Sequence, residues 1–328
     1  MNDSVAPIKV LSVVGPGRSG TTVLGSILAE VDGFSCTGEL RWLWERGVQE
    51  RRPCGCSKPP AECVVWGPVV ALTCSSTEPG RPEWTLESLV ASQHEIASLG
   101  NRQRVLRSTR GSHEAWDSLD RVRAAIGTAC LAFADITGSR VVVDTSKRPH
   151  DAAVFAGVEG IDHYVVHVVR DPRAVVHSWR KAKTFTVAGT VRTMKSRRMP
   201  SSVRRWIANC LGAEMLRRQI PPSRWLEMRY EDFARDPRQA IDRILELVDE
   251  HGQPPFEDDD TVLLHPNHMV AGNPSRFTVG SVKIRLDEAW RTQMPRRDQN
   301  LVALATKPLM ARYGYKSCPD ALPTAKSA

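Results

Sequence analysis

A short glycine-rich segment, GPGRSGTT from Gly15 to Thr22, contains the residue types that bind phosphate groups. Glycine lets the backbone approach an anion closely, and consecutive backbone N–H groups can then point at the same anion. The donors in this segment are the N–H groups of Ser19, Gly20, Thr21 and Thr22. A helix that starts here adds the positive end of its dipole. The segment therefore predicts a phosphate-binding loop.

The positively charged residue of this loop stands at a different position than in the loops of ATPases and kinases. Those loops follow the pattern GxxxxGK[ST], in which the lysine reaches the outer phosphates and the hydroxyl residue binds Mg²⁺. Here Thr21 occupies the lysine position and Arg18 carries the charge, close to where a first phosphate and its leaving oxygen would lie. A turn that only joins a strand to a helix is the alternative, but it does not account for the arginine and the hydroxyl groups.

Two further segments supply side chains for proton transfer and charge stabilisation. Glu39, in CTGEL, is a candidate base that could take a proton from a hydroxyl group. Lys147, in DTSKRP, could offset negative charge on a bridging oxygen. The ordinary alternatives are a surface or capping glutamate and a surface lysine in a turn. Asp144 ends the run VVVD and could instead hold Mg²⁺ in a P-loop kinase, which is the alternative function.

The segment VVRDPRAVVHSW contains a second candidate anion site. A guanidinium such as that of Arg170 can bind a phosphate through two N–H groups, and Ser178 adds one donor two helical turns later. An Arg–Asp pair followed by a helix N-cap at Asp171 explains the same residues equally well.

Alternating strands and helices must position these residues. Continuous apolar runs predict buried strands at Ile8–Val14, Val141–Val143, His163–Val169 and Trp225–Met228. Apolar periodicity predicts helices at about Thr21–Val31, Asp117–Ala134, Pro172–Lys181, Ser202–Arg218, Pro237–Glu250 and Asp298–Arg312. We therefore predict an α/β, P-loop-like three-layer fold with a central parallel sheet.

The pattern is interrupted between residues 42 and 111, where only residues 86–99 are periodic. We expect an irregular insertion or lid within a single domain of residues 1–318, followed by a disordered tail at 319–328. The spacing C-x-C-x₆-C of Cys54, Cys56 and Cys63 lacks a second close pair, and Cys74 is a distant fourth ligand. We therefore expect no metal site.

The composition of the 328-residue chain is that of a soluble globular protein with a formal charge of +8, which suits the binding of anions. The densest basic stretch has only Trp206 beside it, which favours a helix face or a lid over an anionic ligand and argues against nucleic acid; it comprises Lys195, Arg197, Arg198, Arg204 and Arg205. No run reaches the roughly 18 apolar residues of a membrane span, and residues 1–7 lack a secretory layout. We expect a cytoplasmic protein with reduced cysteines and leave its oligomeric state open.

Several motifs occur in the same order as in a known superfamily. They are GPGRSGTTVLGSIL with GEL after it, VVVDTSKRP, VVRDPRAVVHSW, RYEDFARDP, and GNPSRF with the downstream IRLDEAWR. Together they resemble the superfamily of sulfotransferases that use 3′-phosphoadenosine 5′-phosphosulfate (PAPS). The loop arginine is similar to that of tyrosylprotein sulfotransferases and of many bacterial sulfotransferases, and the resemblance covers nearly the whole chain.

The resemblance implies a role for each candidate residue. Glu39 would be the catalytic base, Arg18 and Lys147 would stabilise the transferred group, and the loop would hold the 5′-phosphate. Arg170 and Ser178 would bind the 3′-phosphate. The remaining assignments place Tyr230 near the adenine and Arg276 and Lys283 in a late loop over the 3′-phosphate.

The base and the overall activity have alternatives. His265 and His268 are further candidates for the base, because many cytosolic sulfotransferases use a histidine. The acceptor is a hydroxylated compound that the sequence does not identify, and a small molecule, a glycan or a glycolipid is favoured. A nucleotide sensor or scaffold with the same fold is the non-enzymatic alternative.

Overall fold

The computed structural model describes residues 7–74, 84–108, 115–187, 190–194 and 196–317. Lys195 and the tail at 319–328, two of the positions interpreted from sequence, lie outside these residues. A five-stranded sheet in the order β2-β3-β1-β4-β7 forms the centre, and each neighbouring pair of strands is parallel. Its strands are β1 (Ile8–Val14), β2 (Phe34–Gly38), β3 (Val141–Lys147), β4 (Ile161–Val169) and β7 (Trp225–Arg229).

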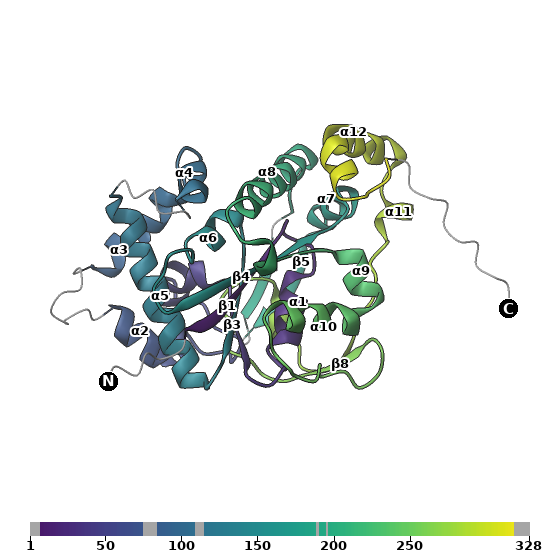
Figure 1. The fold of residues 1–328 in the computed structure, drawn as a ribbon. Coiled ribbons are helices and arrows are strands. Elements are labelled where there is room, and N and C mark those ends of the chain that lie inside the picture. The colour runs from purple at the N-terminus through teal and green to yellow at the C-terminus, as the bar shows by residue number, and fades with distance from the viewer. Residues whose placement is uncertain (1–6, 75–83, 109–114, 188–189, 195, 318–328) are drawn as a thin grey trace.

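The strands are apolar on both faces because helices cover both faces. Along β1, Val10 and Val14 belong to one apolar cluster, whereas Leu11 and Val13 belong to another. The first cluster includes α2 (Trp66–Cys74), α3 (Leu86–Ile96), α4 (Arg102–Arg107), α5 (Asp117–Thr137) and α6 (Pro149–Ala153). The second includes α1 (Thr21–Leu28), α9 (Tyr230–Arg235) and α10 (Pro237–Leu247). Figure 1 shows these two helical layers on opposite sides of the sheet, which confirms the predicted three-layer α/β fold.

The C-terminal part of the chain adds helices beside the end of β4. These are α7 (Pro172–Arg180), α8 (Met199–Arg217), α11 (Trp290–Gln293) and α12 (Arg296–Arg312). Their buried apolar side chains form two smaller clusters. Figure 1 shows α7, α8, α11 and α12 gathered in one part of the molecule. Two small antiparallel sheets of two strands each, which the sequence did not predict, complete the fold: β5 (Lys183–Val187) with β6 (Thr190–Met194) and β8 (Thr261–Leu264) with β9 (Gly280–Lys283).

The predicted helices are present, with small shifts at their ends. The first helix ends at Leu28, three residues before the predicted Val31, and α5 extends to Thr137. Gly138 adopts the left-handed conformation directly after α5 and ends it. Among the described residues, no helix combines the length and the apolar character needed to cross a membrane.

The segment at 42–111 contains more regular structure than the sequence indicated. It begins with the 3₁₀ turn η1 (Leu40–Trp42) and the π-helix η2 (Leu43–Gln49), and the 3₁₀ turn η3 (Pro60–Glu62) precedes α2. Trp66, Val69 and Leu89 are fully buried in the same cluster as α5. The helices are short and separated by cysteine- and proline-rich loops, so their apolar periodicity is interrupted before it becomes recognisable.

The C-terminal ends of all five strands meet at one edge of the sheet, because the strands are parallel. Each strand is followed, or ended, by a residue or loop that the sequence analysis selected. The phosphate loop follows β1, Glu39 follows β2, Lys147 ends β3, Arg170 follows β4 and Tyr230 follows β7. Ligands of open α/β sheets bind at this edge, so the topology brings the predicted residues together.

His167 in β4 is fully buried between Trp225 and Tyr313. Burial lowers the pKa of His167 to about 3, and the positive charges of Arg312 and Arg217 contribute to the shift. Neither ring nitrogen has a hydrogen-bond partner among the described residues, so the folded chain has no means of stabilising a proton there.

The unfolded chain binds a proton at this histidine as the pH falls below about 6.5, while the folded chain stays neutral until about pH 3. Stability is therefore lost as the pH falls through this window. We expect His167→Leu to reduce the slope of the free energy of unfolding against pH by up to about 1.4 kcal/mol per pH unit. Urea denaturation at several pH values measures the slope, with His251→Leu at an exposed position as the control. An unchanged slope would contradict the assignment.

Candidate functional site

The loop after β1 approaches its neighbours so closely that only glycine fits at two positions. A Cβ atom on Gly15 would lie 2.1 Å from the carbonyl oxygen of Val168 in β4. Gly20 has a φ of +77°, and a Cβ there would lie 2.8 Å from the ring of Tyr230. The backbone N–H of Gly15 donates to the carbonyl oxygen of Lys147 at 2.9 Å. The loop is thus held between the ends of β3 and β4, with Tyr230 beneath it.

The beginning of α1 has unused hydrogen-bonding groups. Gly20 is the N-cap and contributes no side-chain cap, and the first N–H groups of a helix have no partners within that helix. The hydroxyl group of Ser19 is fully buried, and within the described part of the chain it lacks a hydrogen-bond partner. Thr21 and Thr22 are buried in the first turn. These donors fit the anion that the sequence predicted.

Arg18 lies against a tryptophan that the sequence analysis did not select. Its guanidinium is 4.8 Å from the ring centre of Trp179, and the guanidinium of Arg197 is 4.6 Å from the same ring. The indole N–H of Trp179 donates to the carbonyl oxygen of Gly17 at 3.2 Å, which fixes the ring beside the loop. Burial lowers the pKa of Arg18, and the charges of Arg170 and Arg197 lower it further. Three positive groups therefore converge here.

Arg170 is buried and held at the end of β4. It donates to the carbonyl oxygen of Arg18 at 2.8 Å and to the carboxylate of Asp287 at 3.0 Å. Its guanidinium lies 4.2 Å from the ring centre of Tyr230. The side chain of Asp287 is 51% exposed, so this carboxylate can leave without opening the core.

The sequence alternative of an Arg–Asp pair with a helix N-cap is confirmed for the cap and wrong for the arginine, because Asp171 caps α7 and pairs with Arg173, whereas Arg170 pairs with Asp287. Asp171 accepts a hydrogen bond from the backbone N–H of Arg173 at 2.8 Å, caps α7 and forms a buried ion pair with the Arg173 side chain. Ser178 lies half-buried in the same helix, next to Trp179.

Glu39 and Lys147 form an ion pair between the ends of β2 and β3. Both side chains are mostly buried, with exposures of 14% and 15%. The backbone N–H of Glu39 donates to the carbonyl oxygen of Val270 at 2.8 Å. Lys147 has a φ of +71°, which costs a non-glycine residue about 1–3 kcal/mol. Its carbonyl oxygen accepts hydrogen bonds from Gly15 and from the amide of Asn209, which hold this conformation.

Asp144 links the two strands that carry this pair. One carboxylate oxygen accepts hydrogen bonds from the hydroxyl of Ser146 at 2.7 Å and from the backbone N–H of Leu40 at 3.2 Å. Burial raises the pKa of Asp144 to about 7, although these hydrogen bonds oppose the shift. The carboxylate considered as a Mg²⁺ ligand is thus engaged by donors of the chain itself and fixes the position of the residue that follows Glu39.

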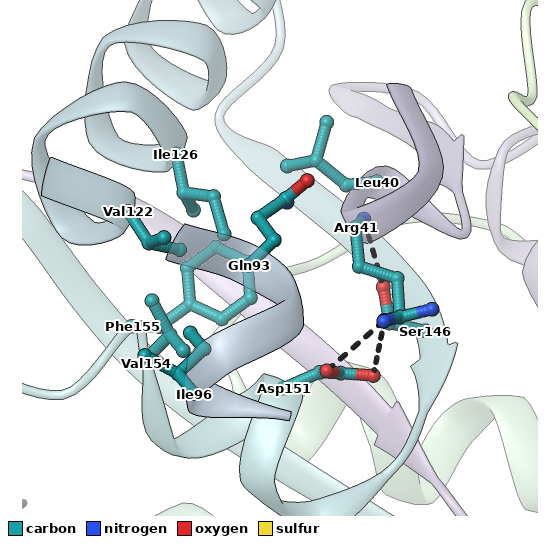
Figure 2. A pocket seen from close by; sticks show the side chains of 10 residues that line it. All are labelled: Leu40, Arg41, Gln93, Ile96, Val122, Ile126, Ser146, Asp151, Val154 and Phe155. Carbon is teal, nitrogen blue, oxygen red and sulfur yellow. Dashed lines mark hydrogen bonds and ion pairs between the residues drawn. The ribbon is translucent and has the colours of Figure 1, made fainter. Parts of the chain in front are cut away.

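A small cavity lies on the α5 side of this region (Figure 2). Arg41 points across it to the carboxylate of Asp151, 3.1 Å away, and the backbone N–H of Arg41 donates to Ser146. The cavity has a volume of about 10 Å³, which is enough for roughly one water molecule and too small for a nucleotide or an acceptor.

Three arginines lie around the ring of Trp42, the residue that follows Arg41 in the chain. The guanidinium of Arg41 is 3.7 Å from the ring centre of Trp42, and that of Arg46 is 3.4 Å from it. Arg148 lies 5.5 Å from the same ring centre. The charge of Glu39 acts on both Arg41 and Arg46. The surroundings of Glu39 are therefore positive.

The structure brings together two groups of predicted residues. Arg18, the loop, Arg170 and Tyr230 form one group, and Glu39 with Lys147 forms the other; the Gly15–Lys147 hydrogen bond joins them.

Four other candidates have different contacts. The guanidinium of Arg276 donates to the carbonyl oxygens of Gly272 and Pro53, and Lys283 is half-exposed and pairs with Asp260. His265 pairs with Glu30, and Nδ1 of His268 lies 3.1 Å from Sγ of Cys63. The carboxylates that pair with His265 and Lys283, Glu30 and Asp260, lie outside the two groups above.

Three residues of the site were not assigned a role from sequence, namely Trp179, Arg197 and Asp287. Trp179 ends the run VVRDPRAVVHSW and Asp287 lies in IRLDEAWR, so the resemblance contained both residues. Arg197 belongs to the basic stretch interpreted as a helix face or a lid, and its position over Trp179 supports the second interpretation.

Comparison with known proteins identifies relatives. A model of the sulfotransferase family matches residues 162–253, which include β4, α7 and Tyr230. Carbohydrate sulfotransferase 3 from Homo sapiens is 30% identical over 176 residues. The aligned region covers 49% of this chain and 35% of that protein, so the chain matches only about a third of the length of this curated relative.

The fold has a counterpart among solved structures. The sulfotransferase domain from the curacin biosynthetic pathway aligns with a TM-score of 0.50 at 16% sequence identity, over 95% of this chain and 99% of that domain. At this identity the alignment shows a shared fold. The family match over residues 162–253 and the shared fold are both those of sulfotransferases, and they agree with the ordered motifs of the sequence.

Proposed function

We propose that the protein transfers the sulfuryl group of PAPS to a hydroxyl group of a small molecule, a glycan or a glycolipid. The observation that carries the proposal is the Glu39–Lys147 pair directly beside a phosphate loop whose cation is Arg18. In the reaction, the acceptor oxygen forms a bond to sulfur as the bond from sulfur to the 5′-phosphate oxygen breaks. The products are a sulfate ester and 3′-phosphoadenosine 5′-phosphate (PAP), and the acceptor proton goes to Glu39.

The phosphate loop would hold the 5′-phosphosulfate end of the donor. The first N–H groups of α1 and the unpartnered, buried hydroxyl of Ser19 supply donors for the phosphate. Arg18 would supply positive charge, which stabilises the phosphate oxygen as it leaves. The mutual repulsion of Arg18, Arg170 and Arg197 decreases when an anion lies between them, so these charges favour the bound state.

The second end of the donor would lie over β4 and β7. Arg170 would exchange the exposed carboxylate of Asp287 for the 3′-phosphate, and Ser178 would add a hydroxyl donor. Tyr230 would contact the adenine from its position beneath Gly20. Arg276 and Lys283 are weaker assignments, because their contacts lie with Pro53, Gly272 and Asp260.

Glu39 and Lys147 would separate in the step that moves the sulfuryl group. Lys147 turns toward the bridging oxygen, where negative charge develops, and this leaves Glu39 free to accept the proton of the acceptor hydroxyl. The position of the Lys147 Cα atom is fixed, because the carbonyl oxygen of this strained residue accepts hydrogen bonds from Gly15 and from Asn209. Arg18 and Lys147 supply the positive charge that the transfer needs, so we assign no metal to this step.

The kinase alternative has weaker support. Thr21 replaces the lysine that reaches the outer phosphates, and Asp144 is buried and engaged by Ser146 and Leu40. A nucleotide sensor would not need a paired base and lysine beside the loop.

Calorimetric titration separates these functions before an acceptor is known. We expect PAP to bind at least about tenfold more tightly than AMP, because its 3′-phosphate adds charge-assisted hydrogen bonds of roughly 1.5–3 kcal/mol each. Mg²⁺ should not affect this binding. Tighter binding of Mg·ATP than of PAP would instead favour the kinase.

Replacement of Glu39 by glutamine tests the base. We expect Glu39→Gln to lower kcat by at least about 100-fold, because the amide cannot accept the proton, while PAP affinity is unchanged. The measurement is transfer of labelled sulfate from PAPS to an acceptor found in a screen of hydroxylated compounds. Glu45→Gln, in the next turn of the chain, is the matched control and should retain activity. Full activity of Glu39→Gln would exclude Glu39 as the base.

Replacement of Arg170 by alanine tests the 3′-phosphate site. We expect the Kd of PAP to rise by roughly 10- to 100-fold, while the Kd of AMP, which lacks this phosphate, changes little. Arg229→Ala is the control, because Arg229 ends the neighbouring strand and forms its own ion pair with Asp232. An equal loss of affinity for PAP and AMP would show that Arg170 acts through the loop and does not bind the 3′-phosphate.

A further inference from the structure

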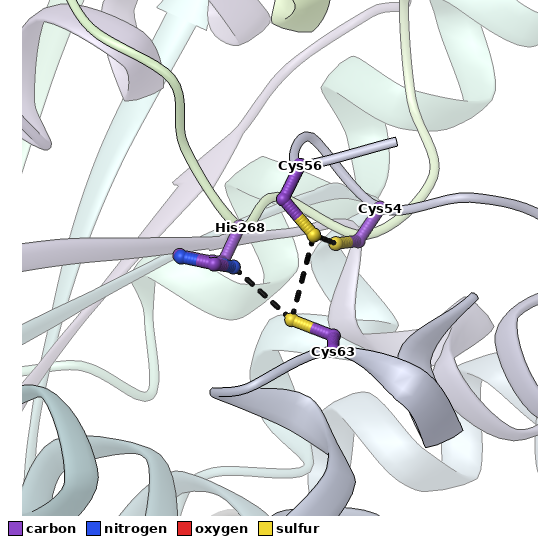
Figure 3. Close-up of side chains that lie close together, drawn as sticks. All are labelled: Cys54, Cys56, Cys63 and His268. Atoms are coloured by element: carbon purple, nitrogen blue, oxygen red, sulfur yellow. Dashed lines mark hydrogen bonds between the residues drawn. The ribbon is translucent and has the colours of Figure 1, made fainter. Parts of the chain in front are cut away.

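We propose that Cys54, Cys56, Cys63 and His268 bind one Zn²⁺ ion that joins the segment before α2 to the segment after β8. The four side chains come from parts of the chain that are about 200 residues apart, and they point toward one another (Figure 3). Sequence spacing argued against a metal because no fourth ligand lies close to the three cysteines. The fold provides that ligand as His268, and Cys74 is not required.

The ligand atoms are spaced for a tetrahedral site. Sγ of Cys54 is 2.9 Å from Sγ of Cys56, which is 3.6 Å from Sγ of Cys63, and this atom is 3.1 Å from Nδ1 of His268. All four atoms lie within 4.8 Å of one another. Zinc with Zn–S bonds of about 2.3 Å needs ligand separations of about 3.8 Å in a tetrahedron. The cluster therefore needs only small side-chain movements to enclose the ion.

A tight turn presents the first two cysteines from one side. The backbone N–H of Cys54 donates to the carbonyl oxygen of Lys58 at 2.9 Å. The backbone N–H of Ser57 donates to the carbonyl oxygen of Cys54, also at 2.9 Å. Gly55 lies against the second segment, where its N–H donates to Met269 and a Cβ would be 2.0 Å from the side-chain oxygen of Asn267. A glycine between the two cysteines is thus required for the two segments to meet.

The histidine is held by its own contacts. The indole N–H of Trp66 donates to the carbonyl oxygen of His268 at 2.5 Å. The side chain of Asn267 accepts a hydrogen bond from the backbone N–H of Met269 at 3.0 Å. These contacts leave Nδ1 of His268 directed at the sulfur of Cys63.

The chemistry of the cluster favours zinc. Three thiols and an imidazole form a Cys₃His set, which is typical of structural zinc sites. Cys54 and Cys63 are buried and all four ligands are protein atoms, so no open position is left for a substrate. Metal binding displaces the thiol protons to solvent.

The site would hold the strand end that carries Glu39. Two residues after His268, Val270 pairs with Gly38 in a parallel bridge and accepts a hydrogen bond from the N–H of Glu39. Zinc would therefore fix the position of Val270, which binds the backbone of Glu39, relative to the turn that contains Cys54 and Cys56. This consequence depends on the proposed function, whereas the metal site itself does not.

Metal analysis of the purified full-length protein is the first test. We expect about one zinc per chain by elemental mass spectrometry, retained after dialysis. Three cysteines should resist alkylation until a chelator is added, and peptide mapping should identify them as Cys54, Cys56 and Cys63. Absence of zinc after expression and reconstitution with ZnCl₂, or a disulfide within the cluster, would overturn the proposal.

Substitutions then test the ligand set. We expect Cys56→Ser and His268→Gln to weaken zinc binding by at least about 100-fold, beyond the loss typical of a residue that only supports a ligand. Competition with a chromophoric chelator measures the affinity. Cys74→Ser and His265→Gln are matched controls outside the cluster and should retain zinc. Cobalt bound to the wild type should give the thiolate charge-transfer and ligand-field bands of a tetrahedral site. Retention of zinc by Cys56→Ser and His268→Gln would exclude this ligand set.

The two proposals can fail independently. Zinc content is read without substrate, and PAP titration is read without turnover. A protein that binds PAP but no zinc would retain the proposed function and lose the metal site. A protein that binds zinc but not PAP would give the opposite result.

Discussion

The parallel arrangement of five strands is the constraint on which the rest of the structure depends. It places the phosphate loop, Glu39, Lys147, Arg170 and Tyr230 at the same edge of the sheet, although they range from Gly15 to Tyr230 along the chain. The arrangement requires apolar side chains on both faces of the strands, because helices cover both faces. Buried residues such as Val10 and Leu11 pack each strand against the helices on both faces, and this packing fixes the position of the strand end that carries a site residue.

Charge at this edge is unevenly distributed. Burial lowers the pKa of Arg18, and the nearby charges of Arg170 and Arg197 lower it further. The described carboxylate that pairs with Arg170 is the half-exposed Asp287. Glu39 is paired with Lys147 in a mostly buried position. Such an arrangement favours a ligand with several negative charges, because the anion replaces repulsion between cations with attraction.

Local strain and close approach maintain this geometry. Lys147 keeps a left-handed backbone because Gly15 and Asn209 both bind its carbonyl oxygen. Gly15 in turn touches Val168 so closely that no side chain fits. The strained end of β3 is thus held by the loop that follows the neighbouring strand β1, and this hydrogen bond joins the two groups of the candidate site.

The sequence by itself determined the features that depend on neighbouring residues. These are the buried strands, most of the helices, the glycine-rich loop between the first strand and the first helix, and the resemblance to sulfotransferases that the ordered motifs carry. The roles of Glu39, Arg170 and the other candidate residues stay predictions, although their positions at one edge fit them. Hydrophobic periodicity and glycine spacing are local signals, so they were visible without the fold.

Only the tertiary structure decided which distant residues meet. Asp287 binds Arg170 across 117 positions, Arg197 shares Trp179 with Arg18, and His268 joins cysteines 205 or more positions away. Spacing along the chain is silent about such contacts, because they arise from the order of the strands and the packing of loops at their ends. That is why the sequence did not reveal His268 beside the cysteine cluster, and why it offered the adjacent Asp171, and not Asp287, as the alternative partner of Arg170.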